Sequence, residues 1–117
     1  MNSTAKSVNG VPILLPLERW KHILKRHHFE GLQEAILETV QKPKDVYIPI
    51  NNLTGQYMAR NTKHRIATKL TTDNLVVHYK EMPQADGFII TAHLISDERF
   101  QRMIKNWKKV YPLNDSE

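Results

Sequence analysis

Two histidines, a lysine and a threonine in the second half of this chain are the side chains best suited to chemistry beside a phosphate. They lie in two runs of alternating character, residues 75–81 and 88–96, separated by a short segment that contains Pro and Gly, as in a β-hairpin. Successive side chains of a strand point to opposite faces, so His78 and Lys80 share one face with Thr91 and His93. Two imidazoles, an ammonium and a hydroxyl on one face can move protons next to an anion.

Symmetric pairing across residues 82–87 sets the expected register of this hairpin. It predicts His78 opposite Thr91, Lys80 opposite Ile89, and His93 diagonal to His78 and within side-chain reach. The other face is expected to carry the apolar side chains Tyr79, Phe88, Ile90, Ala92 and Leu94.

Cleavage of RNA by its own 2′-hydroxyl is a reaction that such a face can carry out. It needs a base for that hydroxyl, an acid for the departing 5′-oxygen, and cations for the charge on the phosphoryl oxygens. Histidine, with a pKa of roughly 6.5, serves as base or acid near neutrality. We therefore interpret His78 and His93 as the acid–base pair, in either order. Thr91 is expected to hydrogen-bond the phosphate or orient a histidine, and the cations that can stabilise the charge are Lys80, Arg26 and Arg60.

Composition limits the class of protein and the kind of partner. With 117 residues, 40% of them hydrophobic and 25% charged, residues 1–117 are expected to form one globular domain. The formal net charge of +5 favours a polyanionic partner, and RNA is the partner that fits the histidine chemistry. The chain has no cysteine, hence no disulfide or cysteine nucleophile. No membrane span or signal peptide is recognisable, so we expect a cytoplasmic protein or a toxin domain delivered by another route.

Hydrophobic spacing predicts the elements that position these residues. Helices are expected over residues 17–28 and 32–42, short strands over 46–50, 56–60 and 65–70, and then the hairpin. Because Pro49 donates no backbone hydrogen bond, residues 46–50 are predicted to form an edge strand. Residues 1–10 are expected to be flexible. Residues 97–111, capped by Ser96 or Asp97, have the spacing of an amphipathic C-terminal helix. The fold class is therefore α+β, with N-terminal helices packed on an antiparallel sheet of about four to five strands.

Further polar residues lie outside the hairpin. His22 and Arg26 are four residues apart, so they share a face of the first helix, which suits either the rim of a site or a solvated surface. His27 lies on the apolar stripe and fits a core position. The spacing of the histidines does not favour a metal site, and we expect neither a metal nor another cofactor. Basic side chains without acidic neighbours are expected to contact phosphates, or else to form solvated faces: Arg60, Lys63, Arg65 and Lys69, and the group Arg99, Arg102, Lys105, Lys108 and Lys109.

Three segments, residues 20–27, 43–46 and 75–92, occur in the order seen in a known superfamily. They read WKHILKRH, PKDV, and LVVHYKE followed by GFIITA. Over residues 17–96 the chain resembles the barnase–EndoU–colicin–RelE-like (BECR) nucleases, especially phage-associated and small bacterial members.

The resemblance implies helices on a sheet of about four strands and metal-independent cleavage of RNA. It also implies site roles for four positions that match the family pattern, namely His22, Arg26, Lys80 and Thr91. Two positions depart from that pattern. His93 stands where relatives often have an aromatic residue, and His28-Phe29 replaces a frequent Pro. An inhibitor or antitoxin protein is a further possible partner, and the alternative function is a binding or toxin–antitoxin interaction module that does not cleave.

Overall fold

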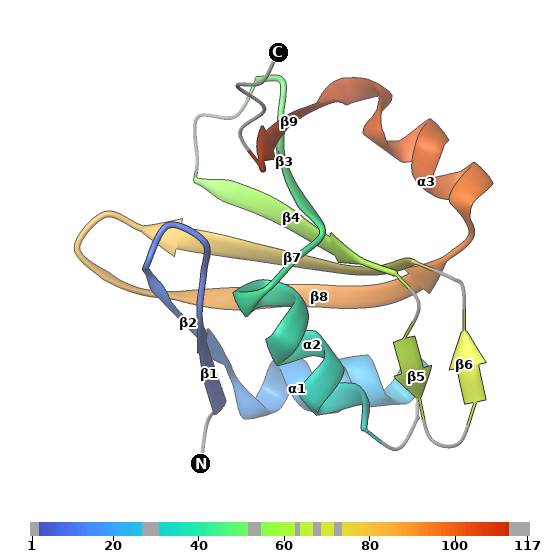
Figure 1. Ribbon diagram of the computed structural model, residues 1–117. Coiled ribbons are helices and arrows are strands. Elements are labelled where there is room, and N and C mark those ends of the chain that lie inside the picture. Colours follow the sequence, from blue (N-terminus) through green and yellow to red (C-terminus); the bar gives the residue numbers. More distant parts are fainter. Residues whose placement is uncertain are drawn as a thin grey trace.

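The computed structural model describes residues 3–26, 31–51, 55–62, 64–66, 69–71 and 74–112. Its first half contains two strands, two helices and two more strands (Figure 1): β1 (Ser3–Lys6), β2 (Pro12–Leu15), α1 (Leu17–Arg26), α2 (Leu32–Gln41), β3 (Asp45–Pro49) and β4 (Gln56–Asn61). The second half is mostly sheet: β5 (His64–Ile66), β6 (Lys69–Thr71), β7 (Asn74–Met82), β8 (Ala85–Ile95), α3 (Asp97–Met103), the 3-10 turn η1 (Ile104–Asn106) and β9 (Trp107–Tyr111).

A seven-stranded sheet with the order β1-β2-β8-β7-β4-β3-β9 forms the centre of the molecule, and β5 pairs with β6 separately. All neighbours in the large sheet are antiparallel except β2 and β8, which are parallel. The α+β class and the packing of helices on a sheet are confirmed. The prediction of four to five antiparallel strands is wrong, because β1, β2 and β9 extend a sheet that is mixed.

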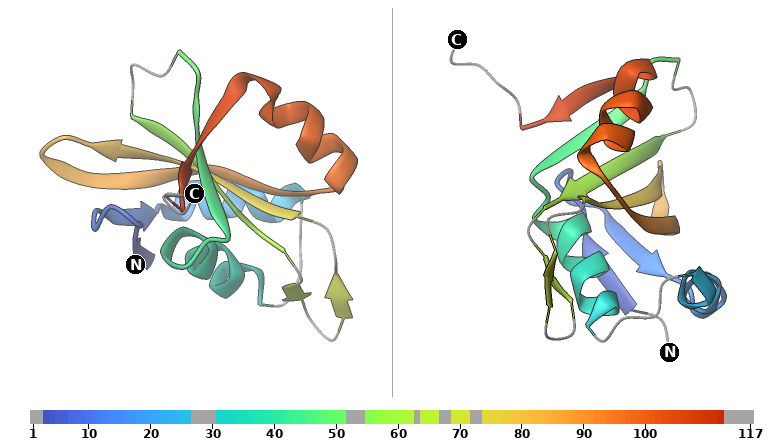
Figure 2. Two further views of the ribbon diagram at one scale, coloured as in Figure 1. Left: turned by 45° about the horizontal axis from the view of Figure 1, so that its top comes forward. Right: turned by 90° about the vertical axis from the view of Figure 1, so that its right-hand side faces the viewer.

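Each face of this sheet has its own apolar cluster. Figure 2 shows α1 and α2 on one side of the sheet and α3 on the other. We call the face covered by α1 and α2 the helix-pair face; there Ile23 and Ile36 pack against Leu75, Val77 and Tyr79. We call the other the α3 face; it is built around Phe100 of α3 with Tyr47, Met58, Val76 and Ile95. Alternation along β7 explains the division, since odd-numbered residues face the helix pair and even-numbered residues face α3.

The β7–β8 ladder contains a bulge that the symmetric hairpin did not predict. His78 pairs with Thr91 as predicted, but Tyr79 then pairs with Ile89, which leaves Ile90 as the extra residue. Lys80 consequently lies opposite Phe88 and not opposite Ile89. The bulge also reverses the predicted faces of residues 88–90 in β8. Ile89, in place of Phe88 and Ile90, joins Ala92 in the core under the helix pair.

Several boundaries differ from those read off the sequence. The segment expected to be flexible contains β1, which pairs with β2. Strand β3 is interior, between β4 and β9, and Pro49 is tolerated at the end of its ladder with β9. Residues 65–70 were expected to form one strand, and the described parts form the separate pair β5–β6.

The C-terminal helix is much shorter than its apolar spacing predicted. It begins at the predicted cap, where the Ser96 hydroxyl accepts a hydrogen bond from the Arg99 N–H. It ends at Met103, and the chain continues through η1 into β9, which pairs with β3. Residues 107–111 contain Trp, Val and Tyr, which favour strands, and pairing with an available sheet edge decided in favour of the strand.

Candidate functional site

His78 and His93 meet on the α3 face of the sheet. His93 pairs with Val76, two residues before His78 on the neighbouring strand, so the two histidines are diagonal neighbours as predicted. Their ring centroids lie 5.3 Å apart with the planes at 76°. The side-by-side placement of the two imidazoles is therefore confirmed, and both side chains are half-buried.

Polar and aromatic residues surround this pair. Thr91 lies directly across the ladder from His78, and Lys80 follows two residues later on the same strand; both are half-buried. On the other side of His78, the β4 ladder brings the fully buried Met58. The Trp107 ring at the start of β9 stands 5.8 Å from the His78 ring. The histidine pair is thus partly open and lies at the margin of the α3 core.

The environment of His78 favours its neutral form. Burial, and secondly the nearby charge of His93, lower the pKa of His78 to about 4. At neutral pH its imidazole therefore has a free lone pair and can accept a proton. Two imidazoles this close resist double protonation, so a proton on either ring disfavours a proton on the other.

The structure places His22 away from this pair. His22 is exposed on α1, which packs its buried Ile23 against the helix-pair face. Ile23 and His93 line one narrow crevice, so this part of α1 lies beside β8. Arg26 is the last residue of α1, and its side chain lies outside the described residues, as do His27 and His28. The shared role of His22 and Arg26 stays a prediction from the resemblance.

Arg60 does not fit the predicted phosphate-binding surface. It is 9% exposed, and its guanidinium makes two hydrogen bonds to the Asp45 carboxylate, the Nε one measuring 2.9 Å. A third bond of 3.3 Å reaches the Asn74 side chain, and the guanidinium lies 4.2 Å from the centre of the Phe100 ring. The charge of Arg60 is thus already paired with Asp45. Its contact with Phe100 links α3 to the sheet.

The remaining basic residues divide between described and undescribed parts of the chain. Lys63 and the side chains of Arg65 and Lys69 lie outside the described residues. The second basic group, from Arg99 to Lys109, is exposed on α3, η1 and β9. Its member Arg102 also forms an ion pair of 3.7 Å with Glu98. Lys108 and Lys109 directly follow Trp107 in β9.

Trp107 is the residue of this site that sequence reasoning missed. Its spacing from Phe100 and Met103 assigned it to the apolar stripe of a helix, whereas it begins a strand and contacts His78. The segment WKKVY shows no alternation of apolar and polar residues, and the only signal for a strand was the β-propensity of Trp107, Val110 and Tyr111.

Comparison of the chain with protein-family models, with curated proteins and with solved structures gives no match. Within the described residues, no three side chains of His, Asp or Glu gather as metal ligands would. No helix in the same part of the chain is long and apolar enough to cross a membrane.

Proposed function

We propose that this protein is a metal-independent endoribonuclease that cleaves RNA by 2′-hydroxyl transphosphorylation. The observation that carries the proposal is the contact between the His78 and His93 rings on a face that also presents Thr91 and Lys80. The net charge of +5 supports RNA as the partner. A toxin role and an inhibitor protein remain predictions from the resemblance to BECR nucleases.

We assign the base role to His78 because its lowered pKa keeps it neutral. Neutral His78 takes the proton from the 2′-hydroxyl as its oxygen attacks the phosphorus. In this assignment His93 acts in its protonated form and gives that proton to the 5′-oxygen as the P–O5′ bond breaks, which leaves a 2′,3′-cyclic phosphate and a free 5′-hydroxyl. The Lys80 ammonium and the Thr91 hydroxyl stabilise the charge on the phosphoryl oxygens.

The test is incubation of the purified protein with mixed RNA in the presence of a chelator. We expect fragments that end in a 2′,3′-cyclic phosphate, and a loss of at least about 100-fold in rate for His78→Ala and for His93→Ala. Lys44→Ala, which removes an exposed cation, serves as the matched control and should cut normally. Circular dichroism shows whether each variant keeps its fold.

The pH profile of kcat/KM distinguishes His78 as a base from an ordinary surface histidine. A base must be unprotonated, so activity should fall as the pH falls through the His78 pKa of about 4 and not near 6.5. If only His22→Ala or Arg26→Ala abolishes cutting, the enzyme activity stands but its assignment to the sheet face is wrong.

The alternative is a binding or interaction module that keeps the positive charge and does not cleave. One observation favours it: His78 packs against Trp107 and is half-buried, as a structural histidine would be. Intact RNA that shifts on a native gel, with no cyclic-phosphate products, would support this alternative and refute the nuclease.

A further inference from the structure

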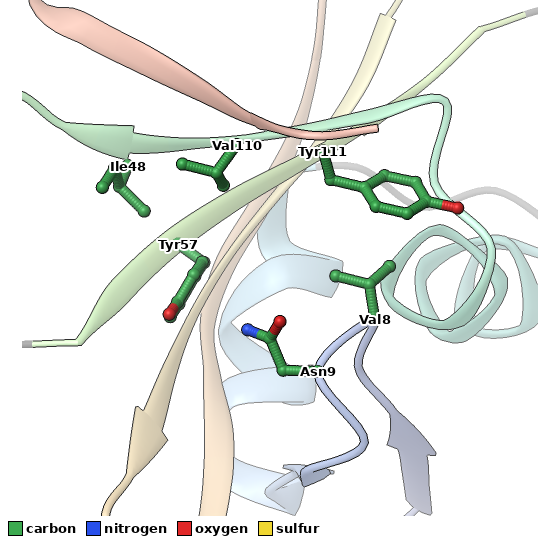
Figure 3. A pocket seen from close by; sticks show the side chains of 6 residues that line it. All are labelled: Val8, Asn9, Ile48, Tyr57, Val110 and Tyr111. Carbon is green, nitrogen blue, oxygen red and sulfur yellow. The ribbon is translucent and has the colours of Figure 1, made fainter. Parts of the chain in front are cut away.

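A second site candidate lies on the opposite face of the sheet from the histidine pair. A half-open cavity of about 420 Å³ is formed between the β1–β2 loop and the strands β3, β4 and β9. Figure 3 shows its walls: Val8, Asn9, Ile48, Tyr57, Val110 and Tyr111. Tyr57, Val8 and Val110 pack against the core of the helix-pair face, so the sheet separates this cavity from His78.

The Tyr57 wall of the cavity is rigid. Its ring stacks on the ring of Tyr79, with centroids 5.5 Å apart and planes at 11°. Tyr79 is fully buried in the core, so it gives the Tyr57 ring a packed support. Because the wall is already in place, an aromatic ring that enters the cavity does not have to order it.

The polar group in the cavity is also fixed in orientation. The Asn9 amide nitrogen donates to both carboxylate oxygens of Glu81 at 3.2 Å, and Glu81 in turn accepts a 2.7 Å bond from the Ser7 hydroxyl. With its nitrogen held in this way, Asn9 turns its carbonyl oxygen toward the cavity, as Figure 3 shows. The cavity thus offers aromatic and aliphatic surfaces with one oriented acceptor.

A second hollow of about 550 Å³ continues from the first. Val8 and Tyr111 line both, and the second is also lined by Lys6, Ser7 and Gln41. Lys6 is exposed and supplies a positive charge at this end. The groove therefore has an apolar, aromatic end with a hydrogen-bond acceptor and a polar end with a cation.

We propose that this groove binds a nucleotide, with the base between Tyr57 and Tyr111 and the phosphate near Lys6. A base has flat faces for the aromatic and aliphatic walls and an edge N–H for the Asn9 carbonyl oxygen. The cavity volume falls within the range of small-molecule sites. Because every base has a flat face and an edge donor, the groove tolerates different bases. The site is independent of the proposed nuclease activity, since it lies on the other face.

Titration of the full chain with adenosine 5′-monophosphate, followed by calorimetry and by amide NMR shifts, tests the proposal. We expect saturable binding, with shifts at Asn9, Tyr57 and Tyr111. Tyr111→Ala should weaken binding about tenfold, because base stacking is lost. Tyr111→Phe is the matched control and should bind normally, since Figure 3 shows the Tyr111 hydroxyl pointing away from the cavity.

Separate probes locate the phosphate and identify the source of the nucleotide. Lys6→Gln should weaken binding of the monophosphate about fivefold and leave adenosine binding unchanged. A 2′-O-methylated oligonucleotide, which cannot undergo 2′-hydroxyl cleavage, tests whether the groove takes a nucleotide within RNA. If the oligonucleotide binds more strongly than the monophosphate, and Tyr111→Ala abolishes this binding, the ligand is RNA. If only the monophosphate binds, the ligand is a free nucleotide.

Two results would overturn the proposal. One is no binding of either probe at millimolar concentration by a protein whose NMR spectrum shows that it is folded. The other is binding that Tyr111→Ala and Asn9→Ala leave unchanged, which would place the ligand elsewhere. Neither result bears on RNA cleavage by the histidine pair, which has its own products and its own variants.

Discussion

The neutral, half-buried state of His78 predicts how the stability of this protein depends on pH. In the unfolded chain a histidine has a pKa of roughly 6.5, whereas in the folded protein the pKa of His78 is about 4. Between these values the unfolded state binds more protons than the folded state, so the free energy of unfolding falls as the pH falls from 6.5 toward 4. Below about 4 this contribution is constant.

The size of the effect follows from the two pKa values. Linkage gives a loss of roughly 2 kcal/mol by pH 5 and about 3 kcal/mol by pH 4, relative to pH 8. This is a large part of the stability of a small domain. Burial is the larger cause of the shift and the charge of His93 the smaller. His93→Leu should therefore restore only part of the normal pKa of His78.

The assay is urea denaturation at several pH values between 4 and 8 for the natural chain and for His78→Leu. Other titrating groups contribute to both curves, so the difference between the curves isolates His78. We expect this difference to decline by about 3 kcal/mol from pH 8 to pH 4. A difference that is flat with pH, or an NMR titration of His78 with its midpoint near 6.5, would refute the burial argument and with it the assignment of His78 as a neutral base.

Two further predictions concern stability. Asp45→Ala leaves the Arg60 guanidinium buried without its partner, so it should lower the free energy of unfolding by about 3–5 kcal/mol in urea denaturation. The double change Asp45→Leu with Arg60→Met removes both charges and should cost much less. Equal losses would contradict the argument that the unpaired buried charge causes the effect. Gly87→Ala puts a Cβ against the Lys80 carbonyl oxygen of β7 and 2.7 Å from Ile13 Cδ1 of β2, so it should cost about 1–3 kcal/mol in urea denaturation. A variant as stable as the natural chain would show that β8 can shift locally away from both neighbours.

Local patterns in the chain determined much of the secondary structure. The spacing of Ile23 in the first helix and Ile36 in the second predicted α1 and α2, and Ser96 was one of the two predicted caps of α3. Alternation in the hairpin predicted that His78 and Thr91 lie opposite each other, with His93 diagonal to His78. These features depend on neighbours in sequence, or on two strands joined by a short turn, so periodicity and turn residues suffice to predict them.

Contacts between distant segments decided the rest. The sequence does not show that Asp45 neutralises Arg60, or that Ile90 is the extra residue of a bulge, because both depend on which strands pair and in what register. Trp107 reaches His78 only because the chain after α3 joins the free edge of β3. The cavity beside Tyr57 exists only where four separate segments meet. Sequence alone therefore determined that His78, Thr91 and His93 share a sheet face, and tertiary packing determined which side chains are paired, buried or open to a ligand.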